Sequence, residues 1–293
     1  MNLSRTLLLV ACSWSLLGIL DAHAQDAATL ERRHTDLREA LASNPFQRPL
    51  HLESSENGSA TQGDIYAVLD QPYGLVGPAL QGMDHWCDIL ILHLNVKQCR
   101  PQRDGQLSVN IGRKFDQPLA DAYLFQFLYT VGKAQPDYLQ VLLSAAQGPL
   151  GTSDYRILLE VVALDARRSF LHLSYAYSAS GAARAAAQVY LATIGRRKVG
   201  FSIVGNDADG GPVYIAGTRG VVERNSMRCY LAIEAYLGAL ALPAQDQVEK
   251  RLNDWYAGIE RYPVQLQELA RGDYLDMKHR EIARQRSASS GAR

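Results

Sequence analysis

The sequence lacks the motifs by which the common enzyme classes bind substrates, metals and cofactors. It contains no GxSxG, HExxH, GxGxxG or Walker loop, and no CxxC pair for zinc or redox chemistry. It also lacks a charge imbalance, because 30 basic and 30 acidic residues cancel, so bulk charge gives no attraction to nucleic acid. We therefore assign no catalytic residue and expect no metal site, no cofactor and no nucleic-acid partner.

Cysteine is scarce as well. Only three of the 4 cysteines follow the first 24 residues, namely Cys87, Cys99 and Cys229. In an oxidising compartment Cys87 and Cys99 can close a short loop, which stabilises a fold by about 2–4 kcal/mol. The alternative is that all three are small buried hydrophobes. We predict a Cys87–Cys99 disulfide, with Cys229 free and buried in a helix.

Long apolar runs are missing except at the start of the chain. The run over residues 6–20 follows Arg5 and is too short to span a bilayer comfortably. Ala22-His23-Ala24 then supplies the small-x-small pattern of a signal-peptidase site. We predict a cleavable signal peptide, residues 1–24, and a periplasmic protein. A lipoprotein attached through Cys12 is an alternative, because residues 9–12 resemble a lipobox, and an uncleaved anchor is a third.

What the sequence does contain is a series of five strand-like segments with no helix long enough to interrupt them. Each is rich in Tyr, Phe, Val, Ile and Leu, and short stretches with Gly, Pro, Asp or Ser separate them. Because crossover helices do not fit between them, the strands are predicted to form an antiparallel meander. The segments are Leu107–Arg113, Ala122–Val131, Tyr138–Ala145, Tyr155–Leu164 and Phe170–Ser178.

Helical patterns precede and follow this meander. Apolar residues at steps of three and four predict amphipathic helices, of which Asn225–Leu242 is the longest. We predict an N-terminal helix and arm over residues 25–62, one domain over 63–275, and a basic, disordered tail over 276–293. The other predicted helices are Ala27–Ala42, Tyr73–Gln81, Met83–Val96, Ala182–Ile194 and Val248–Ile259, and further strands are predicted at Gly63–Leu69, Lys198–Val204 and Val213–Ala216.

This order of elements resembles that of the START-like, or SRPBCC, helix-grip superfamily. The resemblance is carried by the strand Gly63–Leu69, the helical pair within Tyr73–Val96, the strands from Leu107, and the helix Arg224–Leu242. It implies an α+β fold with a curved antiparallel sheet wrapped around a long C-terminal helix, here with extra N- and C-terminal helices. Members of the superfamily typically enclose a hydrophobic cavity for lipids, sterols or polyketides, and some are cyclases or aromatases.

Strand alternation indicates which residues can face such a cavity. A cavity for an amphipathic ligand needs mostly apolar walls and a few polar anchors. The alternative is that the aromatic residues form ordinary core and that Arg156 and Glu160 form a surface ion pair. The predicted ligand-binding residues are Tyr123, Phe125, Arg156, Glu160, Tyr175 and Arg224.

The sequence thus favours a periplasmic carrier of a lipid or another hydrophobic or amphipathic small molecule. One alternative is an enzyme on the same fold, of the cyclase or hydrolase type, acting through a single acid or base. The other is an interaction protein of the cell envelope with a filled core. A transient contact with a membrane or an envelope protein is also expected. An enzyme would place at least one acid or base inside the cavity, and the candidates are His85, His93, His172, Asp84 and Glu160.

Overall fold

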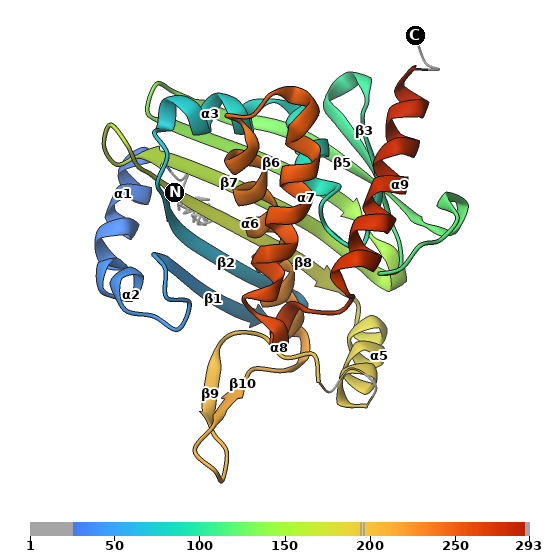
Figure 1. Cartoon of the computed structure of the whole chain (residues 1–293). Helices are drawn as coiled ribbons and strands as arrows, with labels where there is room; N and C mark the ends of the chain where they lie inside the picture. Colours follow the sequence, from blue (N-terminus) through green and yellow to red (C-terminus); the bar gives the residue numbers. More distant parts are fainter. Residues whose placement is uncertain (1–25, 194, 196, 291–293) are drawn as a thin grey trace, which may run out of the picture.

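An antiparallel sheet of eight strands forms the centre of the described part of the chain (Figure 1). The computed structural model describes residues 26–193, 195 and 197–290, so the predicted signal peptide and Cys12 lie outside the described residues. The strand order is β1-β2-β8-β7-β6-β5-β4-β3. The strands are β1 Leu50–Asn57, β2 Ala60–Leu69, β3 Val96–Pro101, β4 Gln106–Ile111, β5 Tyr123–Ala134, β6 Tyr138–Gln147, β7 Thr152–Ala163 and β8 Ser169–Ala179.

The predicted antiparallel meander is confirmed. From β4 to β8 each strand pairs with the next along the chain, since short turns join antiparallel neighbours. The sheet then closes back on β2, which lies between β8 and β1. The arm that we expected before β2 contributes β1, an additional edge strand.

One face of the sheet, here called the inner face, is covered by the long helix α6 (Gly217–Ala239) and by α7 (Ala244–Glu260). Figure 1 shows both helices crossing the sheet, with α3 (Tyr73–Gln81) near its upper edge. The apolar stripe of α6, with Met227, Tyr230, Ile233 and Leu237, is buried against this face. The predicted α+β architecture, a curved sheet around a long helix, is therefore confirmed.

The opposite, outer face carries the extra N-terminal helices. The residues predicted as one helix, Ala27–Ala42, form α1 (Ala27–Asp36) and α2 (Arg38–Ala42). Their buried leucines, among them Leu30 and Leu41, form a second apolar cluster. The sheet contributes Tyr66, Tyr138, Val162 and Phe170 to this cluster.

One predicted helix is too long at its C-terminal end. We predicted Met83–Val96, but α4 covers only Met83–Leu90, and Val96 begins β3. The buried stretch that follows α4 turns the chain so that β3 pairs with β4 along the edge of the sheet. The predicted disulfide between Cys87 on α4 and Cys99 on β3 is present and ties the two elements together, and Cys229 is free.

The prediction of a disordered tail over residues 276–293 is wrong for the part that the structure describes. Helix α9 covers Arg271–Ser290. Lys278 and Glu281 are fully buried, and Glu281 also pairs with the buried Lys97 of β3 at 2.9 Å. These internal ion pairs hold α9 against β3, although the basic residues of this segment suggested a solvated tail.

The remaining elements lie around the sheet. Helix α5 (Gly181–Ala192) and the small hairpin of β9 (Ile203–Asn206) and β10 (Pro212–Tyr214) precede α6, and the hairpin projects away from the sheet (Figure 1). Among the described residues, no helix combines the length and apolar character that a membrane span requires. The short helices are α8 Pro263–Leu266 and the 3₁₀ turns Arg103–Gly105, Leu119–Asp121 and Pro149–Gly151.

Candidate functional site

A cavity of about 220 Å³ lies between the inner face of the sheet and the helices that cover it. Strands β4, β5, β7 and β8 form one wall, and α6 with the turn after α4 forms the other. The walls are mostly apolar or aromatic, with a few polar groups, as expected for a small-molecule site. The lining residues are Leu90, His93, Asn95, Val96, Val109, Ile111, Phe125, Phe127, Pro149, Tyr155, Ile157, Tyr175, Asn225 and Cys229.

The aromatic wall follows from the alternation of side chains along the strands. Phe125 and Phe127 are two residues apart on β5, so both face inward, and their rings stack with centroids 5.3 Å apart. Tyr155 of β7 meets Phe125 edge to face at 4.9 Å. Tyr175 of β8 completes this wall.

The wall formed by α6 is the more polar one. Asn225 and Cys229 are four residues apart, so both point to the same side of the helix. Burial raises the pKa of the Cys229 thiol to about 12, so this cysteine stays protonated and is a poor nucleophile. Burial also holds the pKa of Tyr175 well above its usual value. The polar groups on both walls are therefore uncharged hydrogen-bonding groups.

His93 is the titratable base in the cavity wall. Burial lowers its pKa well below the usual value, and the charges of Arg228, Lys278 and Lys114 lower it further. Its Nδ1 accepts a hydrogen bond from the backbone N–H of Asn95 at 3.2 Å. A neutral imidazole that accepts at Nδ1 carries its proton on Nε2. His93 thus offers a neutral donor to the cavity.

Two of the six predicted ligand-binding residues line this cavity, namely Phe125 and Tyr175. Tyr123 lies beside it: its ring contacts that of Phe125 at 5.3 Å, and the residue is 40% exposed. Arg224 is buried next to the cavity but pairs with Glu268 instead of lining the wall.

The prediction that Arg156 and Glu160 face the cavity is wrong. Both lie on the outer face of β7, because they alternate with the inward-facing Ile157 and Leu159. Arg156 is exposed. Glu160 is fully buried, but under α1 rather than under α6.

Several residues that line the cavity were not among the predicted ligand-binding residues. His93 was named only as one of five candidate acids or bases for an enzyme, and Asn95 was not named. Both fall in the segment that we predicted as helix, so their place in a turn was hidden. Asn225 and Cys229 were part of a predicted amphipathic helix, and their four-residue spacing is the signal that places them on one face.

The outer face holds a buried cluster of ionisable groups. His172 Nε2 is 3.0 Å from Asp64 Oδ1, and His172 Nδ1 is 2.8 Å from Glu160 Oε2. Glu160 also accepts a hydrogen bond of 2.5 Å from the hydroxyl of Tyr138. Burial by itself would lower the pKa of His172, but hydrogen bonds to Asp64 and Glu160 outweigh it and raise the pKa. The two carboxyl groups on either side of the ring therefore favour the protonated form of His172.

Helix α1 closes this cluster from the outside. The ring of Tyr66 stacks on His172 with centroids 4.4 Å apart, and the guanidinium of Arg33 lies 4.8 Å from the centre of the Tyr66 ring. The cluster is packed rather than hollow, so it offers no space for a ligand. Among the described residues, no group of three His, Cys, Asp or Glu side chains has the arrangement to hold a metal ion.

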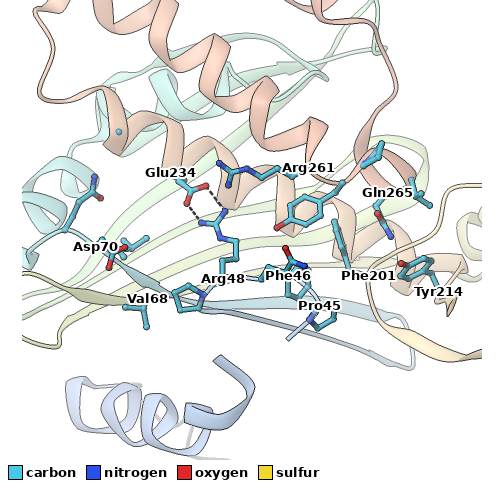
Figure 2. Close-up of a pocket in the computed structure, with 18 residues that line it drawn as sticks. Pro45, Phe46, Arg48, Val68, Asp70, Phe201, Tyr214, Glu234, Arg261 and Gln265 are labelled. Carbon is cyan, nitrogen blue, oxygen red and sulfur yellow. Dashed lines mark hydrogen bonds and ion pairs between the residues drawn. The ribbon is translucent and has the colours of Figure 1, made fainter. Parts of the chain in front are cut away.

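A larger but open groove of about 950 Å³ lies at another edge of the molecule, between the start of β1, α6 and the loop before α8 (Figure 2). Of its four charged side chains, Arg48 and Glu234 pair with each other, and Asp70 and Arg261 also line it. Figure 2 shows the guanidinium of Arg48 facing the carboxylate of Glu234, and Arg48 also donates to the hydroxyl of Tyr230 at 2.9 Å. We favour the cavity beneath α6 as the ligand site, because its walls are mostly apolar and aromatic, whereas four charged side chains line the groove.

Comparisons with known proteins give no sequence relative. No family model matches the chain, and no curated protein matches it. Solved structures with a similar arrangement include a START superfamily protein from Mycobacterium smegmatis, with 10% identity over 44% of this chain and 78% of that chain and a TM-score of 0.30.

Two further structures are comparable. The human StarD13 lipid transfer and protein localization domain is 11% identical over 45% of this chain and 71% of its own, with a TM-score of 0.32. Norcoclaurine synthase from Thalictrum flavum is 15% identical over 48% of this chain and 86% of its own, with a TM-score of 0.32. The START-like fold predicted for this chain is confirmed, and it rests on the strand order and the position of α6 described above.

Proposed function

We propose that this protein binds a small hydrophobic or amphipathic molecule in the cavity between the sheet and α6, and that it acts as a carrier outside the cytoplasm. The observation that supports binding is the mostly apolar cavity with a few uncharged polar groups, among them Tyr175, His93 and Asn225. Its volume of about 220 Å³ lies below the usual range for drug-sized ligands, roughly 300–1,000 Å³. The ligand, or the part of it inside the protein, is therefore small.

Apolar burial supplies the driving force in this proposal. Each Å² of apolar surface removed from water contributes about 25 cal/mol, and the rings of Phe125 and Phe127 provide the surface against which the ligand packs. The polar groups orient the ligand, because a buried polar group without a partner is costly. This division of roles is the basis for proposing a carrier.

The location outside the cytoplasm is supported by two features. The disulfide between Cys87 and Cys99 is of a kind that persists in oxidising compartments. The apolar run over residues 6–20 followed by Ala22-His23-Ala24 has the pattern of a signal peptide. Fractionation of cells that express the full chain tests this part: recovery in the cytoplasm with reduced cysteines would contradict it.

Co-purification tests the binding itself. The chain from Gln25 onward is purified from a bacterial periplasm and examined by native mass spectrometry, and the same sample is then extracted with organic solvent. We expect a discrete adduct that the solvent removes.

A pair of variants sharpens this test. Val109 lines the cavity and is 1% exposed, so Val109→Phe should fill the cavity and abolish the adduct, at a cost of about 1–3 kcal/mol for overpacking. Val204→Phe on β9, where the valine is 59% exposed, makes the same change at the surface and should keep the adduct. Loss of the adduct in both variants, or in neither, would contradict the proposed site.

A second candidate function, an enzyme on the same fold, is favoured by the position of His93. Its neutral ring lines the cavity and is the kind of group that serves as a general acid or base. The extracted molecule is incubated with the wild-type protein and with His93→Gln, and mass spectrometry follows its conversion. Conversion by the wild type alone establishes an enzyme, whereas an unchanged molecule in both samples favours the carrier.

A further inference from the structure

A cluster of cations beside the cavity shares one carboxylate. Arg224 and Arg228 on α6 and Lys114 in the loop after β4 all pair with Glu268, which lies between α8 and α9. The Nη2 atom of Arg228 is 2.6 Å from Oε1 of Glu268. The two arginines are only 4% and 3% exposed. Three basic side chains thus face one carboxylate in a largely buried place, and the two arginines alone outnumber it.

Glu268 does not satisfy all the donors of this cluster. In the described part of the chain, the Nε atoms of Arg224 and Arg228 are buried and have no hydrogen-bond partner. Burial lowers the pKa of Lys114, and the charges of Arg228, Lys198 and Arg224 lower it further, which shows how closely the cations crowd one another. Buried donors without acceptors and buried cations in excess are both unfavourable. A second anion would relieve both conditions.

The cluster adjoins the cavity. On α6, Asn225 and Cys229 line the cavity wall, and each directly follows an arginine of the cluster. The charges of Arg228 and Lys114 also reach His93 in the same wall, where they add to burial in lowering its pKa. The excess positive charge therefore lies next to an otherwise apolar space.

We propose that the cluster binds the anionic head group of an amphipathic ligand, a carboxylate or a phosphate monoester, whose apolar part occupies the cavity. This inference rests on the proposed function and goes beyond it, because it fixes the charge and the orientation of the ligand. In the free protein Glu268 occupies the head-group site as an internal carboxylate. The side chains of Lys114 and Glu268 are 27% and 14% exposed, so the ligand enters on this partly open side and displaces Glu268.

Isothermal titration calorimetry with defined probes tests the proposal. The purified chain is titrated at low salt with octanoate, octyl phosphate and 1-octanol, and with acetate and inorganic phosphate as head groups that lack a tail. We expect at least one of the octyl anions to bind tenfold or more tightly than 1-octanol, and this preference to shrink as salt is raised. The tighter of the two anions identifies the head group.

Two variants change the site in opposite directions. Lys114→Met removes one donor, which a bound anion would favour in its protonated form, and should weaken octanoate binding about tenfold while leaving 1-octanol unchanged. Glu268→Gln removes the competing carboxylate and should tighten octanoate binding, an effect that a purely structural role of Glu268 does not produce. Glu249→Gln is the matched control, because Glu249 pairs only with His279 and Asn253 at the surface, and it should bind like the wild type. If Glu268→Gln fails to fold, the result for Lys114→Met decides.

The possible outcomes separate the inference from the proposed function. Equal affinity for octanoate, octyl phosphate and 1-octanol overturns the head-group site but keeps the apolar carrier. Acetate or phosphate binding as tightly as the octyl anions also overturns it, since the tail then contributes nothing. A protein that binds no octyl compound, yet retains an extractable neutral molecule, contradicts the inference alone. A protein that binds no octyl compound and retains no adduct contradicts both.

Discussion

Each face of the sheet carries a histidine, and the surroundings of the two rings shift their pKa values in opposite directions. His93, under α6, has a lowered pKa and is neutral. His172, under α1, has a raised pKa, so its protonated form is favoured. Burial lowers the pKa in both cases. The difference comes from the neighbours, which are cations around His93 and the carboxylates Asp64 and Glu160 around His172.

This contrast shows how one sheet serves two purposes. On the outer face the ionisable groups pair with one another. They form a packed cluster that fixes α1 to the sheet. The inner face keeps its polar groups neutral and leaves space between them. A ligand site requires open space together with polar groups that keep unused hydrogen-bonding capacity, and the inner side of the sheet offers both.

The largest expected effect comes from replacing His172 by leucine, and the same change at His93 provides the comparison. His172→Leu leaves Asp64 and Glu160 buried beside each other without their cation, so we expect a loss of about 3–5 kcal/mol of unfolding free energy. His93→Leu loses one hydrogen bond, to the N–H of Asn95, and should cost about 1 kcal/mol. Urea denaturation monitored by circular dichroism measures both.

An exposed histidine provides the control for this pair. His279 is paired with Glu249 at the surface, and His279→Leu should change stability by less than about 1 kcal/mol. Equal losses for His93→Leu and His172→Leu would show that the two faces do not differ in the way described here.

A smaller effect is expected from opening the disulfide, which belongs to the inner side alone. Cys87 and Cys99 are 12 residues apart, and a loop of this size corresponds to about 2–4 kcal/mol. The double variant Cys87→Ser/Cys99→Ser should lose this amount in urea denaturation, and a reductant should have the same effect on the wild type. Cys229→Ser, which leaves the disulfide intact, should keep its sensitivity to reductant. In the double variant the NMR signals of the His172 ring should be the same as in the wild type. A change in these signals would show that the two faces of the sheet are coupled.

The smallest effect is expected from pH, and its sign should differ between the two histidines. The raised pKa of His172 stabilises the fold fully below the unfolded value of about 6.5, and this contribution is lost as pH rises through the folded pKa. The lowered pKa of His93 acts in reverse, because below about pH 6.5 the unfolded chain takes up a proton that the folded chain refuses.

Differences between wild type and variants isolate these two slopes. The stability of the wild type minus that of His172→Gln should fall as pH rises from about 6 to 9. The stability of the wild type minus that of His93→Gln should rise between about pH 5 and 7. Slopes of the same sign for both histidines would contradict the assigned directions of the pKa shifts.

Much of the architecture could be predicted from the sequence, because local patterns carry it. Alternation of apolar residues identified the meander and placed Phe125 and Tyr175 on the inner face. Alternation does not say which of two half-apolar faces a helix covers, so Glu160 was assigned to the wrong side. The N-terminal helix that buries Glu160 was predicted, but its docking position depends on contacts far apart in the sequence.

The cluster of Arg224, Arg228, Lys114 and Glu268 could be predicted only in part, because its members come from parts of the chain that are far apart in the sequence. Arg224 was selected because the helix was predicted to begin there, although α6 begins at Gly217. Lys114 and Glu268 are far from it in the sequence and gave no local signal. The helix α9 was missed because its ion pairs are internal. Basic residues such as Lys278 indicate a solvated tail when only their charge is considered. The sequence does not show that Lys278 and its partner Glu281 are buried together.

The ion pair between Lys97 and Glu281 also bears on how the fold forms. The two residues are 184 positions apart and both are fully buried. Helix α9 packs against β3 and places Met277 and Glu281 on the Lys97 ammonium, so Lys97 is enclosed only when α9 docks. Burial of the lysine and its pairing with the carboxylate therefore arise in one step, and the cost of an unpaired buried charge is avoided.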